Sequence, residues 1–268
     1  MARREAKNFY WGFISLPHDQ RMAIYALYDF AREVDDVADG AGRDDRAAQL
    51  AAQRERVHRC AQGIYADPVM HVLAGAIKRY EIPEEELQAL IDGVETDFHR
   101  TRYETWEELR EYCRLVASIV GRLCVRIFGF DDPAALERAD DLGLALQLIN
   151  ILRDVREDAE MGRIYLPQED LRRFGVDEEA IFSGAPSPGW RGLVTFEAQR
   201  ARSLYESGIR VVDYIPYRPG VCVQTMAGIY QRILAHIERE PELPFRRRAS
   251  LSNMEKLGVV VSSWLGAR

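Results

Sequence analysis

The chain of 268 residues lacks an apolar run long enough to cross a membrane. Its longest stretch without a charged residue, from Pro219 to Gln231, is 13 residues long, whereas a membrane-spanning helix needs roughly 20 apolar residues. The N-terminus carries positive charge in Met-Ala-Arg-Arg-Glu-Ala-Lys, but no continuous apolar segment and no cleavage site come after it, so it is not a secretory signal. We therefore expect a cytoplasmic protein.

The sequence also has no zinc-binding motif and no redox motif of cysteine and histidine. The 4 cysteines show no C-x-x-C spacing, and the 5 histidines are dispersed along the chain. This spacing argues against a zinc site or a redox pair and favours cysteines that act as small buried apolar residues.

Nor does the chain have an excess of positive charge or a linker. Its net charge of −7 argues against a nucleic-acid surface, so no nucleic-acid partner is expected. No Gly/Ser/Pro-rich linker, low-complexity tract or internal repeat divides the sequence, and 47% of its residues are apolar. We predict one domain, residues 1–268, with a large core.

Helical periodicity is what the sequence has in abundance. Apolar residues recur at three- and four-residue spacing, and strand-like alternation is rare, which predicts an all-α fold. Proline at positions 17, 68, 83 and 133 marks four of the helix starts. The expected helices are 19–39, 45–63, 68–79, 83–98, 104–129, 132–158, 190–215, 219–239 and 252–265.

Two acidic stretches carry a carboxylate pair at four-residue spacing: Asp35/Asp39 and Asp154/Asp158. Residues i and i+4 share one face of a helix, so each pair repels unless a cation lies between its members. Taken singly, such a pair is most often an ordinary solvated helix end. Here each pair comes after an apolar run, 22–31 or 142–152, which predicts a helix surrounded by protein.

Carboxylate pairs at the ends of helices that lie within the protein indicate a site for a divalent cation. Oxygen ligands are those that Mg²⁺ and Mn²⁺ prefer. Arg32 lies one turn before Asp35 and Arg153 adjoins Asp154, and a guanidinium can grip a phosphate oxygen pair, although either arginine could instead pair with a neighbouring glutamate. Two acidic faces beside an aromatic-rich apolar cavity suit a substrate with a diphosphate head and a hydrocarbon tail. The aromatic residues near the acids are Phe9, Tyr10, Trp11, Phe13, Tyr25, Tyr28, Phe30, Tyr112 and Tyr165, each of which could equally be core packing.

Three longer motifs resemble the squalene/phytoene synthase family. They are Tyr-Asp-Phe-Ala-Arg-Glu-Val-Asp-Asp-Val-Ala-Asp at 28–39, Gln-Leu-Ile-Asn-Ile-Leu-Arg-Asp-Val-Arg-Glu-Asp at 147–158 and Gly-Arg-Ile-Tyr-Leu-Pro at 162–167. Met-Ala-Gly-Ile-Tyr at 226–230 also fits, so the resemblance covers nearly the whole chain. It implies a single-domain isoprenoid-synthase-type helical bundle around a central cavity.

The resemblance also implies roles for individual residues. Metal binding would fall to Asp35, Asp39, Asp154 and Asp158, substrate binding to Arg32, Gln147, Asn150, Arg153 and Arg247, and steadying of cationic intermediates to Tyr112, Tyr165 and Tyr230. Mg²⁺ is the implied cofactor, with Mn²⁺ as an alternative. One departure from the family pattern is Ala6-Lys7-Asn8-Phe9, where many members have Ser-x-Ser-Phe, so no serine contact to diphosphate is expected.

Within the family, the implied reaction is the head-to-head condensation of two farnesyl diphosphates to presqualene diphosphate in hopanoid and squalene biosynthesis. NADPH is not expected, because no G-x-G-x-x-G motif is followed by an acidic residue, although squalene synthases of the family use NADPH without that motif. The alternatives are phytoene synthase with two C20 substrates, squalene or dehydrosqualene synthase, a chain-elongating prenyltransferase, and a catalytically silent helical scaffold. The scaffold is disfavoured because both acidic motifs are intact.

The apolar substrate and product imply peripheral contact with a membrane surface. Phe245-Arg246-Arg247-Arg248 is the segment that could touch anionic lipid, although three arginines beside a helix end are more often simply solvated.

Overall fold

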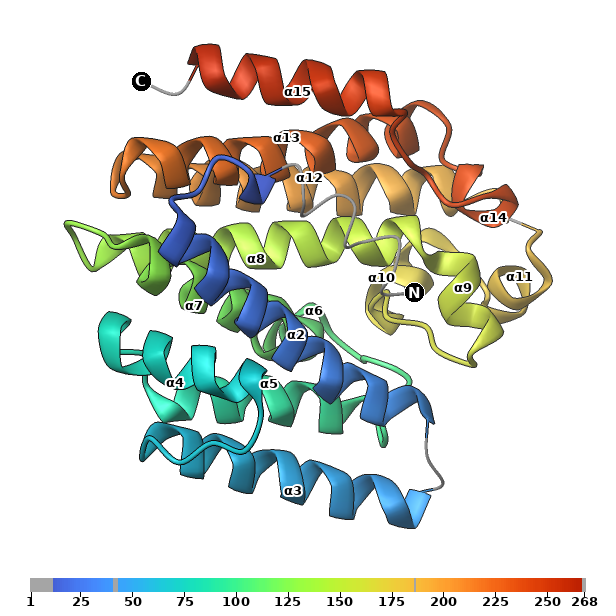
Figure 1. Cartoon of the computed structure of the whole chain (residues 1–268). Helices are drawn as coiled ribbons and strands as arrows, with labels where there is room; N and C mark the ends of the chain where they lie inside the picture. The colour runs from blue at the N-terminus through green and yellow to red at the C-terminus, as the bar shows by residue number, and fades with distance from the viewer. Residues whose placement is uncertain (1–11, 41–42, 186, 267–268) are drawn as a thin grey trace.

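The structure is a computed structural model that describes residues 12–40, 43–185 and 187–266, apart from the side chains of 38–40, 43 and 44. Helices account for nearly all the regular structure in these ranges, and the sole β-type pairing in the described chain is an isolated bridge between Arg102 and Ile164. The all-α prediction is confirmed (Figure 1).

The helices follow the expected order, and six of the nine expected helices agree in length within a few residues, whereas 104–129, 132–158 and 190–215 are each divided. The first half of the chain forms α2 (His18–Gly40), α3 (Arg43–Ala61), α4 (Pro68–Tyr80), α5 (Glu84–Thr96), α6 (Trp106–Cys113), η1 (Arg114–Ser118) and α7 (Ile119–Phe128). The second half forms α8 (Ala134–Arg153), α9 (Val155–Glu160), α10 (Gln168–Phe174), α11 (Glu178–Ser183), α12 (Trp190–Gly208), η2 (Ile209–Asp213), α13 (Tyr217–Arg239), α14 (Leu243–Arg246) and α15 (Asn253–Gly266). Proline begins α4 at its first position, and Asp67 accepts a hydrogen bond from the Met70 backbone N–H as its N-cap.

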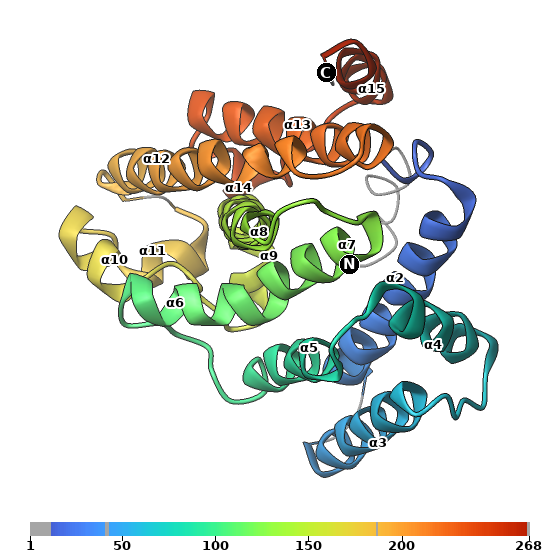
Figure 2. The ribbon, with the colours of Figure 1, turned by 90° about the vertical axis from the view of Figure 1, so that its left-hand side faces the viewer.

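Helix α8 is the central element of the molecule. Seen along its axis in Figure 2, α8 lies between α12 and α13 on one side and α6 and α7 on the other. Buried residues occur all round it, including Leu144, Ala145, Leu148 and Ile149. This confirms the prediction that the apolar run 142–152 lies within protein.

The core has two parts, and α8 contributes to both. One apolar cluster joins the C-terminal half of α8 to α6, α12 and α13, and the other joins its N-terminal half to α2, α4, α5 and α7. Leu146 packs against both clusters. The run 22–31 differs from expectation: α2 buries Ala23, Ile24 and Leu27 on one side but leaves Met22 39% exposed, because only that one side faces the core.

A π-helical turn interrupts the expected single helix over 104–129. Residues Arg114–Ser118 form this turn between α6 and α7. The backbone of the turn lies so close to α8 that a Cβ added to Gly143 would be 2.6 Å from the Cα of Ser118. The Ser118 hydroxyl donates a 2.7 Å hydrogen bond to the Asp140 carbonyl, which ties the turn to α8 at that point.

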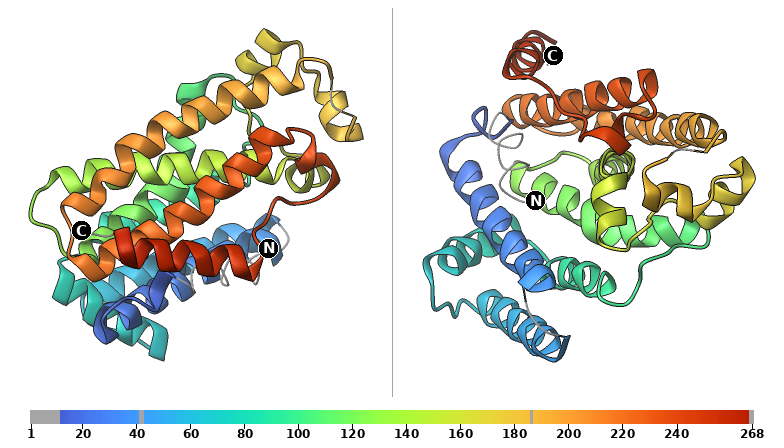
Figure 3. Two further views of the ribbon diagram at one scale, coloured as in Figure 1. Left: turned by 90° about the horizontal axis from the view of Figure 1, so that it is seen from above. Right: turned by 90° about the vertical axis from the view of Figure 1, so that its right-hand side faces the viewer.

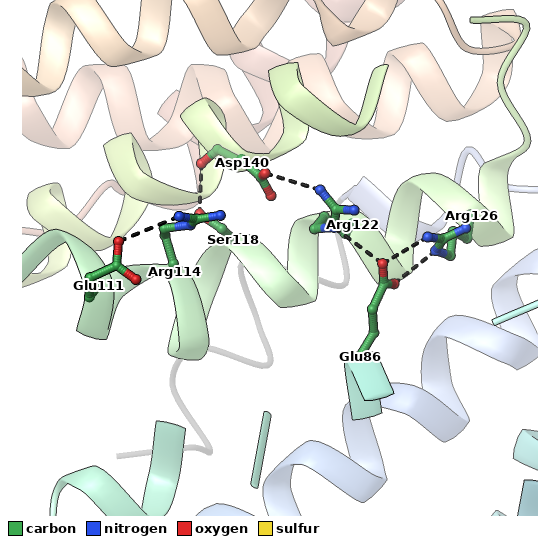
Figure 4. A network of polar contacts seen from close by, with 7 residues as sticks. All are labelled: Glu86, Glu111, Arg114, Ser118, Arg122, Arg126 and Asp140. Atoms are coloured by element: carbon green, nitrogen blue, oxygen red, sulfur yellow. Dashed lines mark hydrogen bonds and ion pairs between the residues drawn. The ribbon is translucent and has the colours of Figure 1, made fainter. Parts of the chain in front are cut away.

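A buried ion-pair network holds α5 to α7 and α8 next to this turn (Figure 4). The Glu86 carboxylate accepts hydrogen bonds from Arg122 at 3.2 Å and from Nε and Nη2 of Arg126 at 2.8 Å, and Arg122 also donates to Asp140 at 3.1 Å. Glu86 is only 8% exposed. A buried charge of this kind is tolerated because each carboxylate oxygen has a cationic donor.

Three short helices, α10, α11 and α14, were not expected from the sequence. Each has seven residues or fewer, too short for helical periodicity to be visible. Helices α11 and α14 contact α9, which carries the second acidic stretch, and α10 packs on α12. All of these short helices lie toward the right-hand side of Figure 1.

Candidate active site

The second acidic stretch does not lie on one continuous helix, which corrects the predicted helix 132–158. The helix ends at Arg153, and Asp154, with φ −104° and ψ 14°, is the junction from which α9 begins. Asp158 still donates its backbone N–H to the Asp154 carbonyl at 2.9 Å, so one helical turn joins the pair. The break turns α9 away from α8 and frees Asp154 to meet residues from the C-terminal part of the chain.

Two arginines hold the Asp154 carboxylate from both sides. Arg153 donates to it at 2.8 and 2.6 Å, and Arg248 donates at 2.8 and 2.9 Å. Asp154 and Arg153 are 8% and 3% exposed, so these charge-assisted pairs are largely shielded from water. The sequence predicted Arg247 for this region, and the structure adds Arg248 as an arginine that contacts the acidic motif directly.

A cavity of about 250 Å³ opens beside this arrangement. Its lining is strongly basic and consists of Arg153, Arg156, Glu157, Glu160, Pro244, Arg246, Arg247 and Arg248. Arg247 therefore lies at the cavity, as an exposed residue. A concave site with this excess of guanidinium groups is suited to a polyanion.

Asp158 and Asn150 each offer a side-chain oxygen that could bind a cation. Burial, followed by the charge of Asp154, raises the pKa of Asp158 to about 8 against the opposing effect of Arg163. The Asn150 side-chain N–H donates to Gln147 at 3.2 Å, while its buried Oδ1 has no hydrogen-bond partner. No group of three or more His, Cys, Asp or Glu side chains is preassembled as a metal cage in the described part of the chain. The donor chemistry fits Mg²⁺ through carboxylate and amide oxygens, with further ligands to come from substrate or water.

Three tyrosines form a buried aromatic cluster next to Asp158. The rings of Tyr103, Tyr112 and Tyr165 have centroids 5.2 to 5.9 Å apart. Tyr112 and Tyr165 donate their phenol O–H to the two oxygens of Asp97, at 3.1 and 3.0 Å. Burial is the main cause that raises the pKa of all three phenols, with the Asp97 charge acting in the same direction, so they stay neutral.

The structure brings together the two predicted tyrosines Tyr112 and Tyr165, and places the third elsewhere. Tyr230, on α13, is 3% exposed and its ring lies 6.0 Å from the Arg153 guanidinium carbon. Tyr230 is thus on the arginine side of Asp154, and the tyrosine cluster is on the Asp158 side.

The first acidic pair lies at the C-terminal end of α2. Asp35 is exposed there, and the side chain of Asp39 lies outside the described residues. Arg32 pairs with Asp36 across 3.9 Å, one helical turn further along α2. Phe9, Tyr10 and Trp11 also lie outside the described part of the chain. The end of α2 and helix α9 lie at the same end of the molecule, toward the viewer in the right-hand panel of Figure 3.

Four residues of this region were missed by sequence reasoning: Asp97, Tyr103, Arg163 and Arg248. Asp97 and Tyr103 lie in the segment between α5 and α6. Asp97 falls at the end of the expected helix 83–98 and Tyr103 just before the next one, and neither belongs to an acidic repeat that marks it. Arg163 donates to the Asp97 carbonyl at 3.4 Å. A signal was present only for Arg163, because it belongs to the Gly-Arg-Ile-Tyr-Leu-Pro motif, and for Arg248, the last of three consecutive arginines.

Comparisons with known proteins identify the family of the chain. The squalene/phytoene synthase family profile matches residues 2–255. Phytoene synthase from Mycobacterium bovis is 38% identical over 98% of this chain and 88% of the relative, and 15-cis-phytoene synthase from Synechococcus elongatus is 34% identical over 95% and 87%.

Solved structures of the same family superpose closely. The squalene synthase HpnC from Alicyclobacillus acidocaldarius has a TM-score of 0.83 and 32% identity over 90% of both chains. A dehydrosqualene synthase in complex with ligand has a TM-score of 0.87 and 29% identity over 99% of this chain and 94% of its own. With the match over nearly its whole length, the two acidic stretches in place and this fold, the chain belongs to the squalene/phytoene synthase family of prenyltransferases.

Proposed function

We propose that this chain condenses two farnesyl diphosphates head to head, forming presqualene diphosphate and releasing diphosphate. The observation that carries the proposal is the proximity of two kinds of group. Asp154, held between Arg153 and Arg248 at the basic cavity, is one helical turn from Asp158, and Asp158 interacts electrostatically with Asp97 of the tyrosine cluster. Polyanion-binding groups therefore lie close to an aromatic surface.

The leaving diphosphate would be held at the basic cavity. Arg153 and Arg248 share the Asp154 carboxylate, and a diphosphate could accept hydrogen bonds from the same guanidinium groups. Asp35, Asp39, Asp154 and Asp158 would hold Mg²⁺, with Mn²⁺ as a substitute. The metal, when bound, would neutralise charge on the diphosphate as the C–O bond breaks. Arg32, Gln147, Asn150 and Arg247 would complete the diphosphate contacts.

The carbon chemistry would take place toward the tyrosines. The C1–O bond of one substrate breaks, and the allylic cation at C1 is attacked by the C2=C3 double bond of the other substrate. Loss of a proton then closes a cyclopropane, and the acceptor is the released diphosphate or a tyrosine that passes its own phenol proton on to Asp97. Neutral phenol rings present their negative faces to such a cation, and a buried setting excludes water that would quench it.

Asp97 would fix the orientation of two of these rings. Both of its oxygens accept a phenol O–H, so Tyr112 and Tyr165 are locked with their oxygens toward Asp97. Tyr230, beside Arg153, would contribute its ring face near the departing diphosphate.

A second candidate function is phytoene synthesis from two C20 diphosphates. It is favoured by the relatives named phytoene synthase, at 34% and 38% identity. The solved squalene and dehydrosqualene synthases, at 32% and 29% identity, favour C15 substrates instead. Completion to squalene or dehydrosqualene in the same chain is a third possibility, and NADPH is not expected to be required for the cyclopropane-forming step.

The test is product identification with purified protein. The protein is incubated with farnesyl or geranylgeranyl diphosphate and Mg²⁺, with and without NADPH, and the products are identified by mass spectrometry. We expect presqualene diphosphate from the C15 substrate in both conditions. Formation of only a C40 product would reject the C15 assignment, and a lack of condensation with either substrate would reject the reaction.

A further inference from the structure

The C-terminal helix α15 (Asn253–Gly266) turns its apolar side outward. Met254 and Leu265 are 77% and 79% exposed, and Leu257, Val261 and Trp264 are 40% to 50% exposed. Their spacing of three and four residues places all five on one face of the helix. We call these five side chains the α15 ridge.

The opposite, inward face of α15 is the more polar one. Its two buried residues are Val259 and Ser263, and its half-buried positions are Glu255, Lys256 and Val260. The Glu255 carboxylate accepts hydrogen bonds from the backbone N–H and hydroxyl of Ser252 and lies 3.5 Å from His236. An ordinary surface helix has the reverse arrangement, with apolar residues toward the core. The α15 ridge carries no charge at all.

The position of α15 in the fold leaves the ridge accessible. The helix packs chiefly on α13, and Figure 2 shows it at the outer edge of the molecule, beyond the layer of α12 and α13. None of the described helices is long and apolar enough to cross a bilayer. A partner for the ridge must therefore be met at the surface.

An aromatic pair closes the C-terminal end of the ridge. The Trp264 and Tyr217 rings lie 6.1 Å apart edge to face, and the Tyr217 hydroxyl donates to the Trp264 carbonyl at 3.0 Å. Both side chains are partly exposed, at 40% and 49%. Trp and Tyr favour the boundary between lipid and water because each ring is apolar at one end and polar at the other.

Cations from α13 border the ridge. Arg232 is exposed and donates to the Glu255 carbonyl of α15 at 2.9 Å. Arg218, next to Tyr217, is exposed and donates to the Ser15 carbonyl at 2.8 Å. Guanidinium groups beside an apolar stripe match phosphate headgroups above an acyl layer.

The size of the ridge favours a bilayer over a second copy of the chain. Five partly exposed side chains on a helix of 14 residues offer on the order of 500 Å² of apolar surface. A stable protein–protein interface buries roughly 800 Å² on each partner. A convex, isolated helix can enter the headgroup region of a bilayer, where the contact area is not limited by the shape of a partner.

We propose that the α15 ridge, with Tyr217 at its end, binds the surface of a lipid bilayer and lies in the plane of the headgroups. This site differs from the one expected from the sequence. Phe245 is 5% exposed and packs on Trp190 with ring centroids 4.6 Å apart, and Arg248 is engaged with Asp154, so the segment 245–248 exposes only Arg246 and Arg247 and no apolar side chain. The membrane site does not depend on the proposed reaction, because the ridge is defined without the active site.

Vesicle flotation tests the proposal without any substrate. Full-length protein is mixed with vesicles of phosphatidylcholine and phosphatidylglycerol, and the floated fraction is compared between wild type and the double variant Val261→Glu/Leu265→Glu. The double variant replaces two apolar side chains of the lipid contact with carboxylates, so it should bind at least about tenfold more weakly. The matched control is Val72→Glu on α4, which is also partly exposed, at 37%, but at the opposite end of the molecule in Figure 1; it should bind like wild type.

Two further measurements separate lipid binding from the alternatives. Lipids brominated in the acyl chain should quench wild-type fluorescence more than that of Trp264→Phe. Sedimentation velocity should give the same oligomeric state for wild type and the double variant. Wild type that does not float, a double variant that floats equally well, or a wild-type dimer that the double variant dissociates would each overturn the proposal.

Discussion

Two aspartates of the candidate site are stabilised in different ways, although both lie in the same region of the fold. Asp154 is held by the charged nitrogens of Arg153 and Arg248, and Asp97 is held by the neutral phenols of Tyr112 and Tyr165. At Asp154, one carboxylate neutralises part of the charge of two guanidinium groups. At Asp97, the carboxylate fixes the orientation of two phenol rings. Their substitution should therefore have different consequences.

Replacing Asp154 with Asn should remove activity and also reduce stability. The variant removes the carboxylate that Arg153, only 3% exposed, shares with Arg248, and breaking a buried pair in this way costs about 3–5 kcal/mol. Arg248 keeps Glu157 at 3.9 Å. Asp35→Asn should abolish turnover just as fully but leave stability nearly unchanged, because Asp35 is exposed. Product formation and the midpoint of thermal unfolding measure the two effects.

Asp154→Asn and Asp35→Asn should differ in stability but not in loss of turnover, and each part can be contradicted separately. Normal turnover by Asp35→Asn would remove Asp35 from the site. An Asp154→Asn protein with an unchanged unfolding midpoint would show that the two arginines find other partners at no cost.

Asp97→Asn tests whether ring orientation matters for turnover. The amide offers one acceptor oxygen where the carboxylate has two, so one of Tyr112 and Tyr165 loses its acceptor. We expect kcat to fall about 10²-fold, in line with the cost of misplacing a group near the reacting atoms, while KM changes little. Steady-state kinetics gives both values.

The double variant Asp97→Asn/Tyr112→Phe provides the control for Asp97. If Asp97 acts by holding Tyr112, the two substitutions together should cost less than the product of their separate effects. Fully multiplicative effects would mean that Asp97 acts independently of that ring.

The residues of the site were only partly predictable. Asp154, Asp158 and Tyr165 lie in motifs that the sequence displays, whereas Asp97 lies between two helices and reaches the site through folding alone. Arg247 and Arg248 are adjacent identical residues, and which of them contacts Asp154 depends on the backbone direction after α14. Sequence spacing carries no information about that direction.

At the scale of elements, the close approach between α8 and the π-helical turn determines where Tyr112 lies. Tyr112 lies two residues before the turn Arg114–Ser118, and Gly143 of α8 lies against the backbone of Ser118. A π-turn adds one residue to a helical turn and so rotates the preceding helix, α6, relative to the next one, α7. The contact with Gly143 fixes that rotation.

Gly143→Ala should therefore be destabilising and should lower activity. An added Cβ would lie 2.6 Å from the Ser118 Cα and 2.8 Å from its N, so α8 and the turn must separate, at a cost of about 1–3 kcal/mol. The matched control is Gly75→Ala, inside α4, where an added Cβ has nothing within 4 Å; it should stabilise by roughly 0.5–1 kcal/mol. Chemical denaturation measures both, and a Gly143→Ala protein as stable as Gly75→Ala would contradict the close contact.

Helix boundaries were predictable where capping residues mark them and not where tertiary contacts decide. Asp67-Pro68 begins α4 as expected. The C-terminal ends of α8 and α6 carry no glycine or proline, so the break at Asp154 and the π-turn could not be predicted from the sequence. At the break, Arg153 and Arg248 bind Asp154. At the π-turn, α8 packs against the backbone of Ser118.

At the scale of the whole molecule, buried ion pairs connect elements around α8 and make stability depend on pH. One such group, Glu197 on α12, is fully buried and shares Arg200 with Asp170 of α10, at 2.8 and 3.0 Å. Two carboxylates that share one guanidinium in a dry setting cannot both ionise easily. Burial and the neighbouring Asp170 raise the pKa of Glu197 to about 8 against the opposing effect of Arg200.

The raised pKa of Glu197 gives stability a definite sign with pH. Between its ordinary pKa of 4.5 and about 8, the unfolded chain loses a proton that the folded chain keeps, so the free energy of unfolding falls as pH rises through this window. The effect is complete above about pH 8 and is on the order of a few kcal/mol. Glu197→Gln mimics the neutral acid and cannot titrate, so its unfolding free energy should fall less steeply from pH 5 to 8.

Urea denaturation at several pH values measures this slope in wild type and variant, and Glu255→Gln serves as a control of opposite sign. Hydrogen bonds from the Ser252 backbone N–H and hydroxyl lower the pKa of Glu255, so the stability that Glu255 contributes is present above its ordinary pKa and is lost only as the pH falls below about 4.5. Glu255→Gln should thus leave the slope between pH 5 and 8 as in wild type. A wild-type slope in Glu197→Gln would mean that Glu197 is ionised in the folded protein and that Arg200 neutralises both acids.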